Sequence, residues 1–161
     1  MTGHAFLFPG QGSQSVGMLA DAARAFGCVR ETFEEASDAL AYDLWALVTA
    51  GPDEQLTLTE YTQPAILTAS VALYRCWKES GGTAPEFVAG HSLGEYSAVV
   101  VSGGFDFSTG LELVKLRAES MQNAGKINPG TMAAIIGLSS YDVNNLCNEY
   151  SKLFGKTWSK N

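Results

Sequence analysis

The feature that most constrains the fold is a short apolar run that ends in a serine flanked by glycines. Phe87–Ala89 is followed by Gly90–Gly94, which reads Gly-His-Ser-Leu-Gly, and then by a helical pattern over Glu95–Val101. A strand that turns this sharply into a helix needs glycine on both sides, because larger side chains would collide there. The segment predicts a buried strand, a tight turn and a helix, with Ser92 at the carboxyl end of a sheet.

The rest of the first 125 residues alternates strand and helix patterns. Ala5–Phe8 is an apolar run ended by Pro9 and Gly10, which indicates a strand leading into a loop. Helices are predicted at about 18–26, 29–40, 44–48, 62–79 and 109–124. This alternation is typical of an α/β fold, with a parallel sheet covered by helices on both faces.

The apolar residues of 62–79 surround that helix, which predicts that it is deeply buried. Polar residues at the predicted helix starts are candidate caps. The caps are expected at Ser13 or Ser15, at Thr62 with Pro64 in the first turn, and at Thr109 with Glu112 as a capping box.

The pattern changes near residue 126. After Asn128–Gly130, a strand is predicted at Thr131–Leu138 and an amphipathic helix at Asp142–Phe154. We therefore expect two domains, a large one at 1–125 and a second at 126–161.

Composition excludes several functions. The formal net charge is −7 without a basic run, which argues against nucleic acid and anionic membrane partners. No apolar stretch is long enough to cross a bilayer, and the start lacks the features of a signal peptide. Cys28, Cys76 and Cys147 are widely spaced, as expected for reduced thiols rather than a zinc site or a disulfide framework. We expect a cytoplasmic protein.

Ser92 is the candidate nucleophile, and an ordinary strand-to-helix turn is the alternative. The Leu93 amide would point to the position of a tetrahedral oxyanion, and the loop Pro9–Gln14 can supply a second amide. That loop could also be an ordinary turn. It does not fit a dinucleotide fingerprint, because Ser15 stands where the third glycine is required.

Arg117 is the second informative residue. On a helical wheel it falls inside an apolar arc of six residues, which are Leu111, Leu113, Val114, Leu116, Ala118 and Met121. A guanidinium placed there must be paired, either with a structural group or with a carboxylate that arrives with the substrate. The two histidines, His4 and His91, are both poorly placed to act as a general base for Ser92.

Several motifs in order resemble one family. They are Phe8–Gln14 (Phe-Pro-Gly-Gln-Gly-Ser-Gln), Thr62–Ala65, Gly90–Glu95, Arg117 with Met121–Gln122, and Met132–Ala134. From residue 5 to about 138, the chain resembles the malonyl-CoA:acyl-carrier-protein transacylases of bacterial fatty acid synthesis.

The resemblance implies a reaction and a site. Ser92 would take malonyl from its substrate malonyl-CoA and pass it to the phosphopantetheine thiol of acyl carrier protein. Gln11 and Leu93 would form the oxyanion hole with their amides, and Arg117 would bind the malonyl carboxylate. Gln63, His91 and Met121 would contribute to the substrate pocket. No metal and no permanently bound cofactor are implied.

Family members are about twice as long, and their base is a histidine in the second half. The resemblance therefore implies the first segment of an α/β-hydrolase-like large domain, followed by the start of a small ferredoxin-like domain, and a truncated chain. Two other functions remain open: a serine thioesterase or esterase, and a non-catalytic fragment that binds acyl-CoA or carrier protein.

Overall fold

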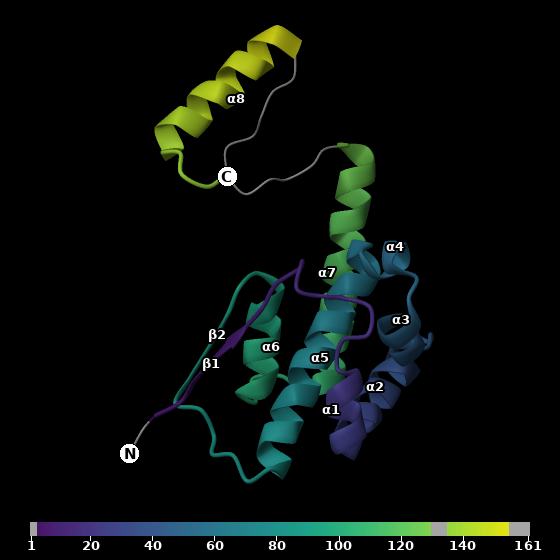
Figure 1. The fold of residues 1–161 in the computed structure, drawn as a ribbon. Helices are drawn as coiled ribbons and strands as arrows, with labels where there is room; N and C mark the ends of the chain where they lie inside the picture. Colours follow the sequence, from purple (N-terminus) through teal and green to yellow (C-terminus); the bar gives the residue numbers. More distant parts are fainter. Residues whose placement is uncertain (1–2, 130–134, 155–161) are drawn as a thin grey trace. The chain divides into compact units, whose positions relative to one another are not determined.

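The computed structural model describes residues 3–129 and 135–154, which belong to two compact units divided after Asn128 (Figure 1). The predicted domain boundary after residue 125 lies within the last helix of the first unit. The boundary itself remains a prediction. In the first unit the elements are β1 (Ala5–Phe8), α1 (Ala20–Ala25), α2 (Gly27–Leu40), α3 (Leu44–Ala50), α4 (Asp53–Leu56), α5 (Thr59–Glu79), β2 (Phe87–Gly90), α6 (Leu93–Val101) and α7 (Phe107–Ile127).

The sheet in the described residues consists of β1 and β2. They pair in parallel, from Ala5 opposite Phe87 to Phe8 opposite Gly90. On one face, Phe6 makes edge-to-face contacts with Tyr74 and Trp77 of α5, and α6 packs against both strands.

The opposite face of this sheet is uncovered in the described part of the chain. The side chains of Leu7 and Phe87 are 79% and 72% exposed, and Ala5 and Ala89 are exposed beside them. The prediction of helices on both faces is therefore wrong here, because α5 and α6 both lie on the Phe6 side. The parallel pairing is as predicted.

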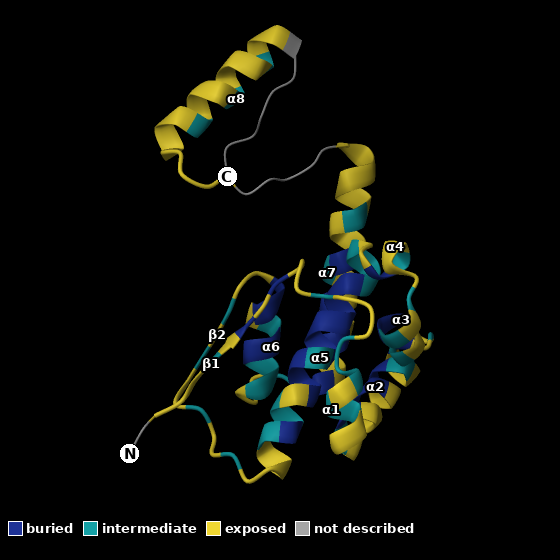
Figure 2. Ribbon diagram, in the orientation of Figure 1, coloured by how far each residue is buried: buried dark blue, intermediate teal, exposed yellow. Residues whose placement is uncertain are grey.

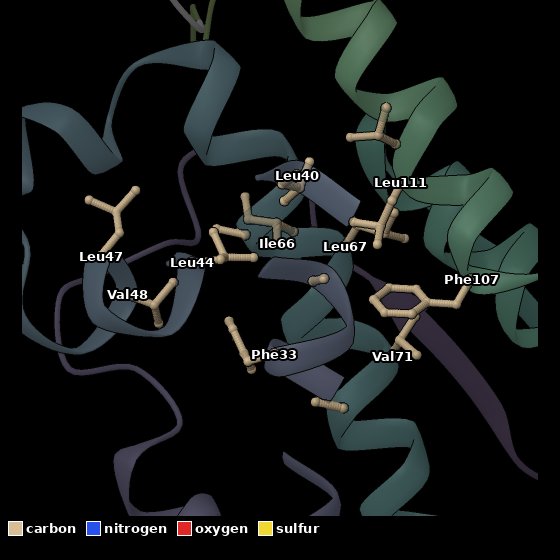
Figure 3. Packing of buried hydrophobic residues seen from close by; sticks show 14 of the residues in the cluster. Phe33, Leu40, Leu44, Leu47, Val48, Ile66, Leu67, Val71, Phe107 and Leu111 are labelled. Atoms are coloured by element: carbon tan, nitrogen blue, oxygen red, sulfur yellow. The ribbon is translucent and has the colours of Figure 1, made fainter. Parts of the chain in front are cut away.

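The hydrophobic core lies within the layer of helices rather than against the sheet (Figures 2 and 3). α5 runs through its centre and is buried on all sides over Thr62–Thr68, as predicted, whereas Leu73, also predicted to be buried, is 52% exposed. Phe33 of α2, Leu44 of α3, Leu67 of α5 and Leu111 of α7 are at most 1% exposed and pack in one cluster. This core holds the first unit together.

Two of the predicted helix starts are wrong. α1 begins after Leu19, whose φ is 63°, without a side-chain cap, and the Ser13 hydroxyl donates instead to the Gly10 carbonyl. α5 begins at Thr59, so Pro64 lies inside the helix. The Thr62 hydroxyl donates to the Leu56 carbonyl, at 2.5 Å, because this buried hydroxyl finds its acceptor in the preceding turn.

The capping box predicted for α7 is also wrong. The cap is Asp106, whose carboxylate accepts a hydrogen bond from the Thr109 amide at 2.7 Å. This bond lowers the pKa of Asp106 below its ordinary value of 3.8. Thr109 thus contributes its amide at the third helical position, and the helix continues through Gly125 to Ile127.

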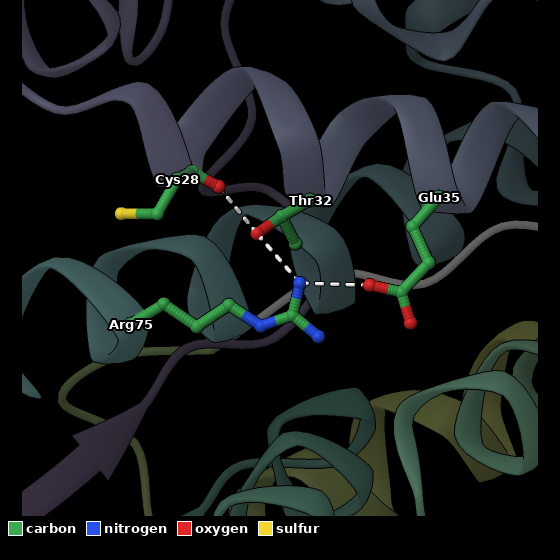
Figure 4. Close-up of polar contacts among 4 residues, drawn as sticks. All are labelled: Cys28, Thr32, Glu35 and Arg75. Atoms are coloured by element: carbon green, nitrogen blue, oxygen red, sulfur yellow. Dashed lines mark hydrogen bonds and ion pairs between the residues drawn. The ribbon is translucent and has the colours of Figure 1, made fainter.

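A polar contact joins α2 to α5 (Figure 4). Arg75 donates through Nη1 to the Thr32 hydroxyl at 3.0 Å and to the Glu35 carboxylate at 2.8 Å. The Thr32 hydroxyl in turn donates to the Cys28 carbonyl at 2.6 Å. Nearby, the sulfur atoms of Cys28 and Cys76 are 3.5 Å apart as free thiols, and burial raises the pKa of Cys28 to about 12.

The second unit contains the helix α8 (Ser140–Phe154), which begins with a serine cap. The Asp142 amide donates to the Ser139 hydroxyl at 3.2 Å. Of the strand predicted at Thr131–Leu138, residues 131–134 lie outside the described residues, as does the motif Met132–Ala134, and residues 135–138 form no strand.

The packing predicts that the core and not the ion pair determines the stability of the first unit. Leu67→Ala should lower the free energy of unfolding by about 2–5 kcal/mol, because it leaves a cavity around a fully buried side chain. Glu35→Gln should lower it by at most about 1 kcal/mol, because the Arg75–Glu35 pair is partly solvated. Urea unfolding of both variants measures the difference, and equal losses would contradict this ranking.

Candidate active site

The backbone at Ser92 has a conformation that residues with side chains rarely adopt. Its φ is 55° and its ψ is −106°, between the end of β2 at Gly90 and the start of α6 at Leu93. Such a conformation persists only where the surrounding structure holds it. It leaves the Ser92 side chain exposed at the carboxyl end of β2, where the sequence placed it.

The glycines on both sides of Ser92 allow close packing that no larger residue permits. A Cβ atom on Gly90 would overlap the backbone of Gly94, and one on Gly94 would overlap the carbonyl oxygen of Phe8. The His91 amide donates to that same Phe8 carbonyl at 3.1 Å. The predicted steric reason for these two glycines is confirmed.

The loop after β1 lies against this turn. A Cβ atom on Gly10 would come within 2.8 Å of the His91 imidazole and carbonyl. The Gly12 amide donates to the Gln14 side chain at 2.8 Å, and the Gln11 side chain donates to the Thr59 hydroxyl at 3.2 Å. These bonds hold the loop in place beside the Ser92 turn.

The backbone amides of Gln11 and Leu93 are available as donors. Within the described residues, both amides lack a protein acceptor. Leu93 is the first residue of α6, where a helix leaves its amides without partners and carries a partial positive charge. Both features suit an oxyanion hole, and this role remains our hypothesis for the two amides.

Arg117 of α7 reaches the serine. Its Nη2 donates to the Ser92 hydroxyl at 2.9 Å, and its Nη1 donates to the side-chain oxygen of Gln63 at 2.5 Å. Gln63 is fully buried in α5, and its Nε2 lies 3.3 Å from the sulfur of Met121. The guanidinium also lies 5.7 Å from the ring of Tyr96.

The surroundings of Arg117 differ from the predicted arc. Leu111, Val114 and Ala118 are buried, whereas Leu113, Leu116 and Met121 are 36%, 62% and 40% exposed. Arg117 is therefore half-buried at the edge of a narrower stripe. In the described ranges its partners are neutral, and the ion pairs there join other residues.

Neither histidine is placed to activate Ser92. His4 precedes β1 and lies 5.5 Å from the ring of Trp77 on α5, while the His91 imidazole lies against Gly10. In the part of the chain that the structure describes, the side-chain bond to Ser92 comes from Arg117. The expectation that His4 and His91 are poor bases agrees with this placement.

Two contacts of the site were missed from the sequence. Tyr96 follows Ser92 by four residues on α6, and that helical spacing could have indicated a ring near the serine. No sequence pattern indicated the hydrogen bond from Gln11 to Thr59, because this bond depends on where α5 begins. Among the described residues, no metal-binding cluster and no helix capable of spanning a membrane is present.

Comparison with known proteins identifies the family. The acyl transferase domain family matches residues 5–148. The chain belongs to this family. It is 58% identical, over 149 residues and 92% of its length, to the malonyl CoA-acyl carrier protein transacylase of Escherichia coli strain K12.

Solved structures of the same kind align closely with this acyl transferase chain. The transacylase of Coxiella burnetii is 50% identical with a TM-score of 0.87, over 93% of this chain and 48% of the other. A malonyl-transacylase solved in complex with a type II polyketide synthase acyl-carrier protein is also 50% identical with a TM-score of 0.83, over 97% of this chain and 50% of that chain.

The chain spans about half the length of the curated relatives it matches, 48% in the case of the Escherichia coli transacylase.

The Ser92 turn predicts a sharp difference between two glycines that both lie in helices. Gly94→Ala should lower the free energy of unfolding by about 1–3 kcal/mol, because its Cβ meets the backbone of β1, which cannot move aside. Gly125→Ala is the control: it meets open space within α7 and should stabilise by about 0.5–1 kcal/mol. Urea unfolding tests both, and a harmless Gly94→Ala would contradict the packing described above.

Proposed function

We propose that this chain carries the nucleophile and the carboxylate-binding group of a malonyl-CoA:acyl-carrier-protein transacylase. The observation that supports it best is the arginine that reaches the serine. Arg117 donates to Ser92 and to the neutral Gln63, and it has no carboxylate partner within the described residues. A partly buried guanidinium without a counter-ion is suited to a ligand that brings the negative charge.

The dimensions of malonyl fit this pair of residues. One methylene separates its carboxylate from its thioester carbon. Because Arg117 Nη2 lies 2.9 Å from the Ser92 hydroxyl, a carboxylate bound to the guanidinium holds the thioester carbon beside the serine oxygen. The substrate carboxylate would replace the hydroxyl as the acceptor of this donor, which frees the serine oxygen to react.

The proposed reaction proceeds through an ester of Ser92. The serine oxygen attacks the thioester carbon, and the carbonyl electrons move onto its oxygen, where the amides of Gln11 and Leu93 would bind the negative charge. Collapse of this intermediate expels the thiolate of coenzyme A. The same steps in reverse transfer malonyl to a second thiol, which gives ping-pong kinetics.

The proton of Ser92 needs an acceptor that the described residues do not provide. The chain holds two histidines, and neither imidazole is hydrogen-bonded to the serine hydroxyl in the described residues. In this proposal the base comes from the part of the domain that the chain does not span. The chain by itself is then expected to form the ester slowly.

Gln63 is proposed as the residue that positions Arg117. Its amide is fixed at both ends, with the oxygen on Arg117 and the nitrogen on the sulfur of Met121. His91 and Met121 would line the substrate pocket. Selection of malonyl over acetyl follows, because acetyl leaves the guanidinium without a negative partner.

Acyl carrier protein is the proposed acceptor, with coenzyme A thioesters as donors. A similar transacylase was solved with an acyl-carrier protein bound, which supports this assignment. At a finer level, we propose that the first unit belongs to an α/β-hydrolase-like large domain and that the second unit begins a small ferredoxin-like domain.

Covalent labelling tests the function. The chain is incubated with malonyl-CoA, quenched in acid and digested, and the peptides are read by mass spectrometry. Malonyl should accumulate on Ser92, much less label should form with acetyl-CoA, and Ser92→Ala should carry none. Ser102→Ala, at the other end of α6, is the matched control and should label like the unchanged chain.

Two further measurements, combined with the labelling assay, separate the two other functions. Hydrolysis of a simple aryl ester without a malonyl label would assign the chain to the serine esterases. Binding of malonyl-CoA in calorimetry without any label on Ser92 would make it a non-catalytic binding fragment. Either result would overturn the proposal.

The role of Arg117 gives a separate prediction. Arg117→Ala should weaken the binding of malonyl-CoA by about 2–4 kcal/mol more than the binding of acetyl-CoA, because only malonyl loses a charged hydrogen-bonded partner. Titration calorimetry with both thioesters measures the difference. Arg24→Ala, at an exposed ion pair on α1, should change neither affinity. Equal losses for the two thioesters would return Arg117 to a structural role.

A further inference from the structure

Two free cysteines face each other between α2 and α5. Cys28 lies in the first turn of α2, and Cys76 lies in the last turn of α5. Their sulfur atoms are 3.5 Å apart, and neither thiol belongs to the candidate active site. A disulfide bond is about 2.0 Å long, so each sulfur has to move by less than about 1 Å to form one. Small rotations of the two side chains provide a movement of this size.

Hydrogen bonds hold the two cysteines in this position (Figure 4). The Cys28 carbonyl accepts a bond from the Thr32 hydroxyl, and Arg75 donates to that same hydroxyl. Arg75 directly precedes Cys76, and it also pairs with the Glu35 carboxylate. These bonds fix the backbone of α2 to the end of α5 at the level of the two thiols. The sulfur atoms are therefore kept within reach of each other.

The two thiols differ in their access to solvent. Cys28 is half-buried, whereas Cys76 is 7% exposed and belongs to the hydrophobic core. A dissolved oxidant therefore reaches Cys28 first, with the Cys76 sulfur in contact behind it. A reachable sulfur with a second sulfur beside it is the arrangement that oxidises to an internal disulfide.

The electrostatic surroundings of Cys28 make its oxidation slow. Burial, followed by hydrogen bonds to Glu79 and Cys76, raises the pKa of the Cys28 thiol to about 12. Because the thiolate is the reacting form, a thiol that stays protonated near neutral pH reacts slowly. The pair thus remains reduced during brief exposure to an oxidant and responds to sustained oxidising conditions.

A bond between these cysteines would enclose most of the core. The segment between them forms α3, α4 and nearly all of α2 and α5. It contains the fully buried side chains of Phe33, Leu44 and Leu67. A disulfide that closes such a loop removes conformations from the unfolded chain, which stabilises the folded layer of helices.

We propose that Cys28 and Cys76 are an oxidation site that closes to a disulfide and fastens α2 to α5. The oxidant is a small-molecule disulfide of the glutathione type. The Cys28 sulfur gives its proton to solvent and attacks one sulfur of this oxidant, whose S–S bond breaks and releases a thiolate. The Cys76 sulfur, which also gives up its proton, attacks the Cys28 sulfur and expels the second thiolate. Two electrons pass from the cysteines to the oxidant, and the two released thiolates take up the two protons.

The oxidation site is separate from the candidate active site. Gln63 and Cys76 are separated by about three and a half turns of α5, or about 20 Å along the helix. The disulfide therefore changes the stability of the chain and leaves the contacts of Arg117 as they are. The proposal does not depend on malonyl transfer.

Oxidation to equilibrium tests the proposal. The reduced chain is held in mixtures of oxidised and reduced glutathione until its state no longer changes, and it is then alkylated and digested with trypsin. Trypsin cleaves after lysine and arginine, so Cys28 lies in the peptide 25–30 and Cys76 in the peptide 76–78. We expect mass spectrometry to find these two peptides joined, and reduction to separate them. The same end point is also approached with chain refolded from urea in the same mixtures, so a slow reaction of the folded thiol does not hide the disulfide.

Thermal unfolding measures the consequence. The oxidised chain should unfold about 5–10 °C above the reduced chain, because the cross-link restricts the unfolded state. Cys28→Ser replaces a half-buried thiol by a hydroxyl of similar size, and it should lose both the joined peptides and this rise. Cys147→Ser is the matched control, since Cys147 belongs to the second unit. It should keep both.

Three results would overturn the proposal. The first is that both thiols stay free at every glutathione ratio, in the folded and in the refolded chain. The second is a glutathione adduct that stays on Cys28 while Cys76 remains free, or a link from either residue to Cys147 instead. The third is a disulfide between Cys28 and Cys76 that leaves the unfolding temperature unchanged or lowers it.

Discussion

The close approach of α6 to the end of β1 is the constraint on which the candidate site depends. Gly94 leaves no room for a side chain above the Phe8 carbonyl, and the His91 amide bonds to that carbonyl. Together they place the turn of Ser92 and the loop of Gln11 side by side. The positive φ of Ser92 is held by this packing, and the free amide of Leu93 results from the same helix start.

The polarity of the site follows from one uncompensated charge. A guanidinium that is partly removed from water needs acceptors, and Arg117 has two neutral ones in Gln63 and Ser92. These bonds give acceptors to its N–H donors but leave its positive charge unbalanced. An anionic substrate therefore gains more from this site than a neutral one, which is the physical basis of the proposed selectivity.

Local patterns in the sequence predicted the turn well, because the requirement for Gly90 and Gly94 is steric and depends on residues close in the chain. The cap of α7 was mispredicted by a few residues, because Asp and Thr both favour helix starts. Only the backbone geometry shows that the Asp106 side chain accepts the capping bond and that Thr109 donates its amide. The start of α5 was missed for a similar reason, because Thr62 bonds outside its own helix.

Features that depend on distant segments could not be predicted in the same way. Periodicity placed Arg117 in a broad apolar arc, but Leu116 and Met121 are exposed because no described element covers them. The partners of Arg117 come from α5 and from the Ser92 turn, and no local spacing indicates them. The uncovered sheet face could not be predicted from the alternation of strands and helices either. That alternation indicates the layers of a whole α/β domain, not which face the described elements cover.

The position of the core explains how a chain about half as long as its curated relatives can hold the candidate site residues together. The fully buried apolar side chains belong to helices α2 to α7, within the helical layer, whereas the sheet buries only one face in the described residues. Arg117 and Gln63 project from α7 and α5, which that core fixes. The proposed carboxylate-binding group, Arg117, is thus positioned by packing that the chain contains. A base for Ser92 and a cover for β1 depend on contacts that the described residues do not supply, so the proposed substrate selectivity and the rate of transfer are separable properties of this fold.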